Sequence, residues 1–288
     1  MVFWIELLIA GLVSGLVIGL VALSITLVFG IARFPNAATG DTMTLGAYGA
    51  LAGHAATGSM LIGGAIGALG GAAVGLAAYA LVFRRLSNRS TVALLVASIG
   101  IGFIIRAGLS LAFGHTQQVF QVPLVRPWRF QGVRIHPNDL RLAATAIASL
   151  AVVFATLYLT PIGRRMRAVA DDPALARVSG ISPVRVMVAL WLLAGAVAAV
   201  AGVILGLRTV VSPEMGWEML LPGFAAAILG GIGNPAGAVV AGLIIGIAQE
   251  MATPVVGFTY KIALSFVVML VVLLVRPRGL FGRVEGVR

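Results

Sequence analysis

The chain has 288 residues, of which 60% are hydrophobic and only 10% are charged, and its mean hydropathy is +1.08. Ordinary soluble domains carry about a quarter of their residues as charged side chains, so this composition excludes one. The net charge of +11 could indicate a nucleic-acid partner. The basic residues lie mostly in short loops between apolar runs, however, so orientation in a lipid bilayer explains them better and no nucleic acid is expected. The absence of cysteine excludes disulfides and thiolate metal sites.

Several apolar runs approach the roughly 20 residues that a helix needs to cross a bilayer. We therefore expect an all-α fold, a polytopic membrane bundle of about eight or nine segments that includes short broken or re-entrant ones. Residues 1–288 are expected to form a single transmembrane domain. The first span should cover residues 3–29, where glycines recur every four residues and predict close packing against another helix. These glycines are Gly11, Gly15 and Gly19.

Residues 30–54 form a weaker segment, which we expect Pro35, Gly40 and Gly46 to interrupt. It is rich in polar side chains, namely Asn36, Thr39, Asp41, Thr42 and Thr44. Irregular backbone at membrane depth is tolerated only where protein or a water-filled cavity surrounds it. The segment therefore either borders a buried pathway or is a plain surface loop before a short span.

The next two spans are expected at residues 59–83 and 91–113. The first has glycines at four-residue spacing, at Gly63, Gly67, Gly71 and Gly75. The arginines that follow it (Arg84, Arg85 and Arg89) indicate a cytoplasmic loop. The second span contains Arg106, which we expect to snorkel to the interface rather than pair with a carboxylate.

Residues 114–139 are the longest stretch with no helical pattern, and alternation from the arginine-rich loops predicts that they lie outside. They contain Arg126, Arg129 and Arg134, so the positive-inside rule is not obeyed here. Trp128 fits either an interfacial aromatic belt or a contact with an external partner.

After a span at 140–159, residues 160–185 form the longest polar interruption, with five arginines and two aspartates. Asp171 or Asp172 can cap a helix that begins at Pro173 and ends at Gly180 with positive φ. A helix of about two turns is unstable alone in water, so it should rest on another surface. We interpret it as a cytoplasmic docking element; the alternative is a solvated basic loop.

The chain should then cross again at 186–207, with Ala198, Gly202 and Gly206 as a close-packing stripe. Residues 214–257 hold two short apolar pieces, neither of which comfortably reaches 20 residues. The last span is expected at 258–275, followed by four arginines, which predicts a cytoplasmic C-terminus. The N-terminus is then external if all nine segments cross. Broken segments early and late in the chain are typical of a transporter pathway built on internal repeats.

No chemistry of an enzyme is expected. The chain has no P-loop motif, so it should not bind ATP by a P-loop, and its three histidines have no metal-binding spacing. We therefore expect no catalytic residues, no metal and no cofactor. An integral-membrane enzyme would need clustered carboxylates or histidines and ranks last among the functions considered.

Several motifs together resemble the permease subunit of branched-chain amino acid ABC importers, the smaller of the two paired membrane subunits. The resemblance covers nearly the whole chain. It rests on N-x-A-x-G-D and L-G-A-Y at 36–41 and 45–48, G-R-R-M-R-A-V-A-D-D at 163–172, L-G-G-I-G-N-P-A-G-A at 229–238 and R-P-R-G-L-F-G at 276–282.

The resemblance implies an importer subunit in the bacterial inner membrane, for branched-chain or other hydrophobic amino acids. It implies that residues 163–181 dock in a groove of a cytoplasmic ATP-binding subunit. It also implies a second homologous permease subunit and an external solute-binding protein at the 114–139 side. The family commonly has an aromatic residue at the position of Ala37 and a histidine at that of Thr39, so the solute could instead be urea, another amino acid or a small organic acid.

The candidate site residues fall into two groups. Coupling to the ATP-binding subunit is assigned to Gly163, Arg164, Arg167, Asp171, Asp172 and Gly180. The translocation path is assigned to Asn36, Thr39, Asp41, Asn234 and Glu250. The expected mechanism is alternating access. The alternative is an ion-coupled secondary transporter that uses Asp41 and Glu250 for ions, but such a protein would not need the capped cytoplasmic helix.

Overall fold

A computed structural model describes residues 2–122, 125–130, 132–276 and 279–282 of the chain. In this part the only strands are β1 (Trp128–Phe130) and β2 (Val133–Ile135), which pair as a small antiparallel hairpin. The predicted all-α class is confirmed. Pro277 and Arg278 of the C-terminal motif, and the arginines after residue 282, lie outside the described residues.

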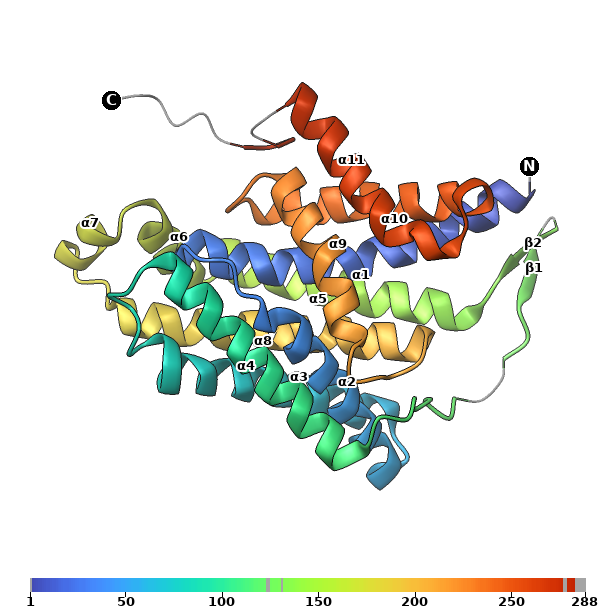
Figure 1. The fold of residues 1–288 in the computed structure, drawn as a ribbon, viewed down its shortest axis with the longest axis horizontal. Helices are drawn as coiled ribbons and strands as arrows, with labels where there is room; N and C mark the ends of the chain where they lie inside the picture. The colour runs from blue at the N-terminus through green and yellow to red at the C-terminus, as the bar shows by residue number, and fades with distance from the viewer. Residues whose placement is uncertain (1, 123–124, 131, 277–278, 283–288) are drawn as a thin grey trace.

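The helices follow one another along the chain with short connections (Figure 1). They are α1 (Val2–Ala32), α2 (Ala38–Thr57), α3 (Met60–Ala78) with the π-helical turn η1 (Tyr79–Phe83), α4 (Thr91–Phe113), α5 (Pro137–Leu159), α6 (Pro161–Asp171), α7 (Pro173–Val178), α8 (Pro183–Arg208), α9 (Met215–Gly230), α10 (Pro235–Val256), the 3-10 turn η2 (Phe258–Tyr260) and α11 (Lys261–Val275).

Within the described residues, seven helical stretches are long and apolar enough to cross a membrane. The polar α2 and the 16-residue α9 bring the number of membrane segments in the described residues to nine, which agrees with the expected eight or nine. The chain is a multi-pass membrane protein.

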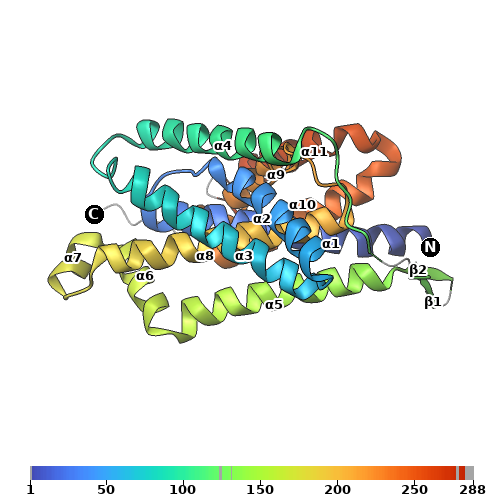
Figure 2. The ribbon, with the colours of Figure 1, turned by 90° about the horizontal axis from the view of Figure 1, so that it is seen from below.

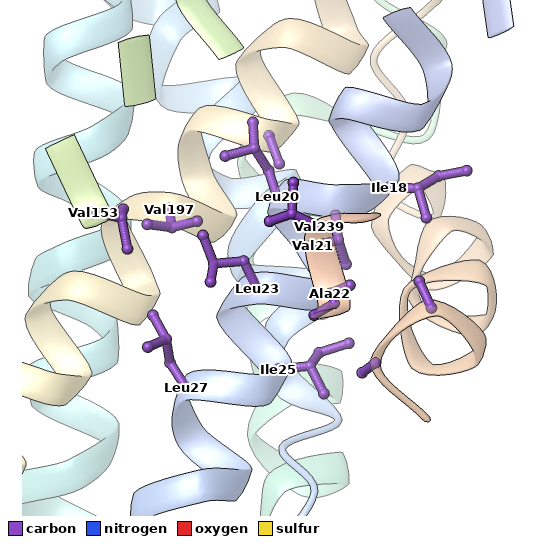
Figure 3. Packing of buried hydrophobic residues seen from close by; sticks show 14 of the residues in the cluster. Ile18, Leu20, Val21, Ala22, Leu23, Ile25, Leu27, Val153, Val197 and Val239 are labelled. Carbon is purple, nitrogen blue, oxygen red and sulfur yellow. The ribbon is translucent and has the colours of Figure 1, made fainter. Parts of the chain in front are cut away.

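Helix α1 lies at the centre of the bundle, between α10, α8, α9 and α5. In its most apolar window 83% of the residues are buried, so this span faces protein rather than lipid. Figure 3 shows its side chains in one cluster with Val153 of α5, Val197 of α8 and Val239 of α10. The hydrophobic core is therefore built around α1.

Glycines let α1 and α10 approach backbone to backbone, as the four-residue spacing predicts. A Cβ added to Gly15 would lie 2.7 Å from the Cα of Leu243, and one added to Gly242 would lie 2.5 Å from the Cα of Gly19. In lipid, where the hydrophobic effect does not drive helices together, such close packing is a main source of association. The packing role predicted for this stripe is confirmed.

The other two predicted stripes also lie in tight helix contacts. A Cβ on Gly63 of α3 would lie 2.6 Å from the carbonyl oxygen of Ala50 in α2, and one on Gly75 would lie 2.6 Å from that of Trp191 in α8. Gly202 of α8 lies directly against the carbonyl of Met43 in α2. Helices α2, α3 and α8 thus form a second close-packed unit beside α1.

The expectation that Gly40 and Gly46 break the second segment is wrong. Helix α2 runs without interruption for 20 residues, and the irregular backbone is confined to residues 33–37 around Pro35. A Cβ on Gly40 would lie 2.5 Å from the carbonyl oxygen of Gly216, and one on Gly46 would lie 2.6 Å from that of Ala199. These glycines make room for neighbouring helices instead of forming turns.

Two further expectations need correction. Of the two apolar pieces expected to be short within residues 214–257, the second is not, because it forms α10 with 22 residues. The first forms α9, which has only 16. Residues 160–185 contain two helices rather than one, since the 11-residue α6 precedes the short capped α7.

The bundle has two distinct ends (Figures 1 and 2). At one end α1 begins beside the hairpin, where the backbone N–H of Arg134 donates to Glu6 Oε1 at 2.8 Å. At the other end α1 finishes near α6, where Arg33 Nη2 donates to the carbonyl oxygen of Ala170 at 3.4 Å. We call these the hairpin end and the α7 end. The arginine-rich connection between α3 and α4 lies at the α7 end.

Replacing Gly15 with alanine should lower the thermal stability of the protein in detergent. The added methyl group meets backbone atoms of α10 that cannot move aside, and overpacking of this kind costs about 1–3 kcal/mol. The matched control is Gly100→Ala in α4, where an added Cβ has nothing within 4 Å. Equal melting temperatures for the two variants would contradict the close-packing role of Gly15.

Candidate translocation and coupling sites

The break between α1 and α2 is buried inside the protein. Phe34 is 2% exposed and Ala37 is 5% exposed. The backbone N–H of Ala37 donates to Ser98 Oγ of α4 at 3.0 Å, and that of Ala38 donates to Asn36 Oδ1 at 3.2 Å. Side chains thus satisfy backbone groups that the break leaves free. The alternative of a plain surface loop is wrong.

Asn36 and Thr39 lie beside a very small internal cavity. Thr39 Oγ1 donates to the carbonyl oxygen of Asn36 at 2.9 Å. With Trp191 and neighbouring residues they line a cavity of about 10 Å³, which is about the space of one water molecule. Trp191 Nε1 is buried there without a hydrogen-bond acceptor among the described residues. This cavity is too small for a solute, and the role of both residues in a path stays a prediction.

Asp41 forms an ion pair with Arg106, which joins α2 to α4. Arg106 Nε and Nη2 lie 3.0 and 2.9 Å from Asp41 Oδ1. The Asp41 side chain is 2% exposed and that of Arg106 is 18% exposed. Gly102 of α4 gives the carboxylate its space, because an added Cβ would collide with Asp41 Oδ2. The expectation that Arg106 snorkels is wrong, since a buried carboxylate needs a positive partner.

Arg106 also lines a cavity of about 820 Å³ between α4 and residues 212–218. Its guanidinium lies between two rings, 5.4 Å from the centre of Phe103 and 5.0 Å from that of Trp217. The same cavity is lined by the carboxylates of Glu214 and Glu218. It therefore offers groups of both charges to a small polar molecule.

Glu214 and Glu218 are not among the residues that the sequence predicts for a site. Both lie beside the first turn of α9, and nothing in the local sequence separates them from ordinary interfacial acids. Only the fold brings them next to an arginine more than a hundred residues earlier in the chain.

Glu250 lies in a different polar cluster. Lys261 Nζ donates to Glu250 Oε2 at 2.8 Å, and Ser14 Oγ donates to Glu250 Oε1 at 2.9 Å. Arg208 in turn donates to Ser14 Oγ. The cluster joins α1, α8, α10 and the start of α11, and it balances the charge of Glu250. The structure does not bring Glu250 together with Asp41, so its path role stays a prediction.

Asn234 lies at the α7 end, near the predicted coupling residues. Its Oδ1 accepts from the N–H of Gly237 at 3.1 Å and caps α10, while Nδ2 donates to the carbonyl oxygen of Phe281 at 3.2 Å. Asn234 lines a cavity of about 430 Å³ together with Arg167 and Asp171. The structure therefore groups it with the coupling segment and not with Asp41.

Helix α6 is folded back against the end of α5. Thr160 Oγ1 accepts from the N–H of Gly163 at 3.2 Å and caps the helix. Gly163 lies so close to the carbonyl oxygen of Leu157 that an added side chain would collide with it. Arg167 donates to that same oxygen, and its guanidinium lies 5.1 Å from the ring centre of Tyr158. Gly163 and Arg167 thus fix α6 to α5.

Helix α7 has the predicted caps at both ends. Asp172 Oδ1 accepts from the N–H groups of Ala174 and Leu175 at 2.8 and 3.0 Å. These bonds hold the pKa of Asp172 below its ordinary 3.8, so the cap is ionised at neutral pH. Gly180 follows the helix with φ +79°. The capping aspartate is Asp172, whereas Asp171 is the last residue of α6.

Two apolar side chains of α7 that are not among the predicted site residues are strongly exposed. Leu175 is 64% exposed and Val178 is 86% exposed, while Ala176 is buried on the opposite face. Arg164, at the same end of the molecule, is exposed as well. Helix α7 therefore presents an apolar tip in an otherwise basic region.

Residues 7–273 match a protein-family model described as branched-chain amino acid transport system / permease component. The chain belongs to this family. It is 30% identical to the high-affinity branched-chain amino acid transport system permease protein LivH of Escherichia coli K12, over 98% of this chain and 97% of LivH. It is 28% identical to the corresponding permease protein BraD of Pseudomonas aeruginosa, with the same coverage.

Among solved structures, a chain of PsaBC from Streptococcus pneumoniae in complex with Fab superposes with a TM-score of 0.52. That match is 14% identical and covers 96% of this chain and 93% of the other, so it concerns the fold alone. The family match favours a permease of an ABC transporter over the ion-coupled secondary transporter.

Removing one partner of the Asp41–Arg106 pair should destabilise the protein by about 3–5 kcal/mol, because the other charge is left buried without a partner. We expect Asp41→Asn and Arg106→Gln each to lower the melting temperature in detergent. The double variant should be clearly more stable than the sum of the two losses predicts. Arg85→Gln, which removes an exposed charge at the α7 end, serves as control. Additive losses would contradict the pairing.

Proposed function

We propose that this chain is the membrane-spanning subunit of an ATP-driven importer for branched-chain or other hydrophobic amino acids. The observation that carries the proposal is α7, a short capped helix whose apolar tip is exposed among arginines. The chain has no P-loop, so ATP would be hydrolysed on separate cytoplasmic subunits. Membership of the permease family supports both parts of this assignment.

Helix α7 has the properties of a docking element. Six residues are too few for a helix that is stable on its own in water, and its exposed Leu175 and Val178 have no partner surface within the described chain. A groove on an ATP-binding subunit would bury both side chains. Asp172 and Gly180 would set the shape of α7, and Arg164 would lie beside the contact.

The remaining coupling residues would transmit movement rather than bind the partner. Gly163 and Arg167 hold α6 against the end of α5, and α7 leads directly into α8. Asp171 lines the cavity between α6 and the α9–α10 connection. A displacement of α7 by the ATP-binding subunit would therefore reach two long helices at once.

The charge distribution supports an orientation in the inner membrane. Arginines gather at the α7 end, which we assign to the cytoplasm together with the C-terminus. The N-terminus and residues 114–139 would then lie outside, where a solute-binding protein delivers its ligand.

A second homologous permease subunit would complete the translocation path. The least buried spans are α4 and α11, and Figure 2 shows both on the same side of the bundle. We assign that side to the partner permease.

The 820 Å³ cavity at α4 and α9 is the proposed mouth of the solute route. An amino acid carries an ammonium group and a carboxylate, and the cavity offers Glu214 and Glu218 to the first and Arg106 to the second. Two donors of Arg106 are already bound to Asp41, so the interaction with a carboxylate would be weak enough for release. Ala37 and Thr39, where the chain departs from the family pattern, do not line this cavity.

Replacing Leu175 and Val178 together with glutamate should abolish co-purification of the chain with its ATP-binding subunit. Two carboxylates cannot be buried in an apolar groove without a large desolvation cost. Asn88→Glu, an exposed position at the same end, should leave the complex intact. If the double variant folds and still retains the ATP-binding subunit, α7 is not the docking element.

Replacing Glu218 with glutamine should raise the KM for leucine uptake by the assembled transporter about tenfold, the effect of losing one charged hydrogen bond. Uptake should fall less for an analogue that lacks the ammonium group. Glu6→Gln removes a carboxylate at the hairpin end while keeping an acceptor for Arg134, so it should leave uptake unchanged. An unchanged KM in Glu218→Gln would show that the route does not use this cavity.

A further inference from the structure

A second large cavity lies on another side of the bundle. It is an apolar groove of about 760 Å³ between the start of α3 and the start of α5, near the hairpin end. Its floor is a stripe of α8 formed by Val200, Val203, Ile204 and Leu207, whose spacing puts them on one helix face. Leu61 of α3 and Leu142 of α5 form parts of its walls. This groove shares no lining residue with the proposed solute cavity.

Polar side chains without partners also line this groove. Asn138 and Arg141, both in the first turns of α5, make no side-chain hydrogen bond or ion pair within the described part of the protein, and neither does Gln121. His54 Nδ1 is buried and has no hydrogen-bond partner in the same part. The lining includes an arginine but neither aspartate nor glutamate. The groove thus combines a long apolar surface with an unpaired positive charge.

We propose that this groove binds an anionic phospholipid, with an acyl chain along the α8 stripe and the headgroup phosphate at Arg141. The medium around a membrane protein supplies the ligand, and an arginine forms strong charge-assisted hydrogen bonds with a phosphate group. Arg141 lies near the start of a span, where a long basic side chain reaches the interface. The absence of an acid from the lining favours a lipid with net negative charge over a zwitterionic one.

The proposed lipid site also explains the position of Arg141, which the positive-inside rule does not explain. If the hairpin end is external, as proposed above, Arg141 lies on the side where basic residues are disfavoured. A bound headgroup would neutralise it. The lipid site itself depends on neither that orientation nor the identity of the solute, and its test measures lipid binding rather than transport.

The test is native mass spectrometry of the assembled transporter, purified in mild detergent and titrated with phosphatidylglycerol or with phosphatidylethanolamine. We expect wild-type protein to retain phosphatidylglycerol in preference to phosphatidylethanolamine. Arg141→Ala should weaken phosphatidylglycerol binding about tenfold, and Arg141→Lys should keep most of it. Arg134→Ala removes an exposed arginine at the same end and should have no effect.

A second variant tests the acyl-chain part of the groove. Ala144→Phe should fill the space beside the α8 stripe and weaken the binding of both lipids, with the melting temperature reported alongside to show that the chain is folded. The proposal is overturned if the two lipids bind wild type equally, or if Arg141→Ala and Arg134→Ala lose phosphatidylglycerol to the same extent. It is also overturned if Ala144→Cys cross-links to the second permease subunit, because the groove would then be a protein interface.

Discussion

The backbone contact between α1 and α10 is the constraint on which the rest of the bundle depends. Gly15 of α1 lies against Leu243, and Gly242 of α10 lies against Gly19, so neither helix can move away without losing contact along its length. Because lipid tails are as apolar as leucine side chains, burial alone does not hold such helices together. Dense packing does, and it places most of α1 inside the protein, in contact with α5, α8, α9 and α10.

The burial of most of α1 allows α2 to be polar. The chain leaves α1 through buried irregular backbone and continues into a helix whose threonines and aspartate would be costly against lipid. Two of these polar groups instead have partners on other helices: Asp41 binds Arg106 of α4, and Thr44 Oγ1 accepts from the N–H of Gly216 at 3.0 Å. These contacts fix α4 and the start of α9 on either side of α2, and the cavity lined by Glu218 lies between them.

Local sequence predicted features whose cause is local. Cap residues such as Asp172 and Gly180 act within a few residues of their own position, and four-residue glycine spacing marks one face of a helix whatever lies against it. Gly40 and Gly46 were misread because a glycine that ends a helix and one that admits a neighbour look the same in sequence. Only the folded structure distinguishes the two cases, because it shows the carbonyl groups of Gly216 and Ala199 packed against Gly40 and Gly46.

The sequence also could not predict which residues far apart in the chain would form pairs. Arg106 and Asp41 are separated by 65 positions, and the spacing gives no sign that they meet. The prediction that Arg106 snorkels was the better choice for an isolated helix, since a long side chain can reach the interface at low cost. Burial of Asp41 reverses that preference, because an unpaired carboxylate inside the bundle costs more than holding the arginine in place.

The same packing connects the proposed coupling segment with the proposed solute cavity. Gly30, near the end of α1, lies against Gly233 in the α9–α10 connection, and Asn234 shares a cavity with Arg167 of α6. Helix α9 runs from that connection to the cavity lined by Glu218. Closely packed helices move as rigid bodies rather than deform gradually. If the proposed function holds, a shift of α6 would pass to α1, which contacts α6, and from Gly30 of α1 to Gly233 and α9. The cavity at the far end of α9 would then change with it, so alternating access would have a continuous physical route through one chain.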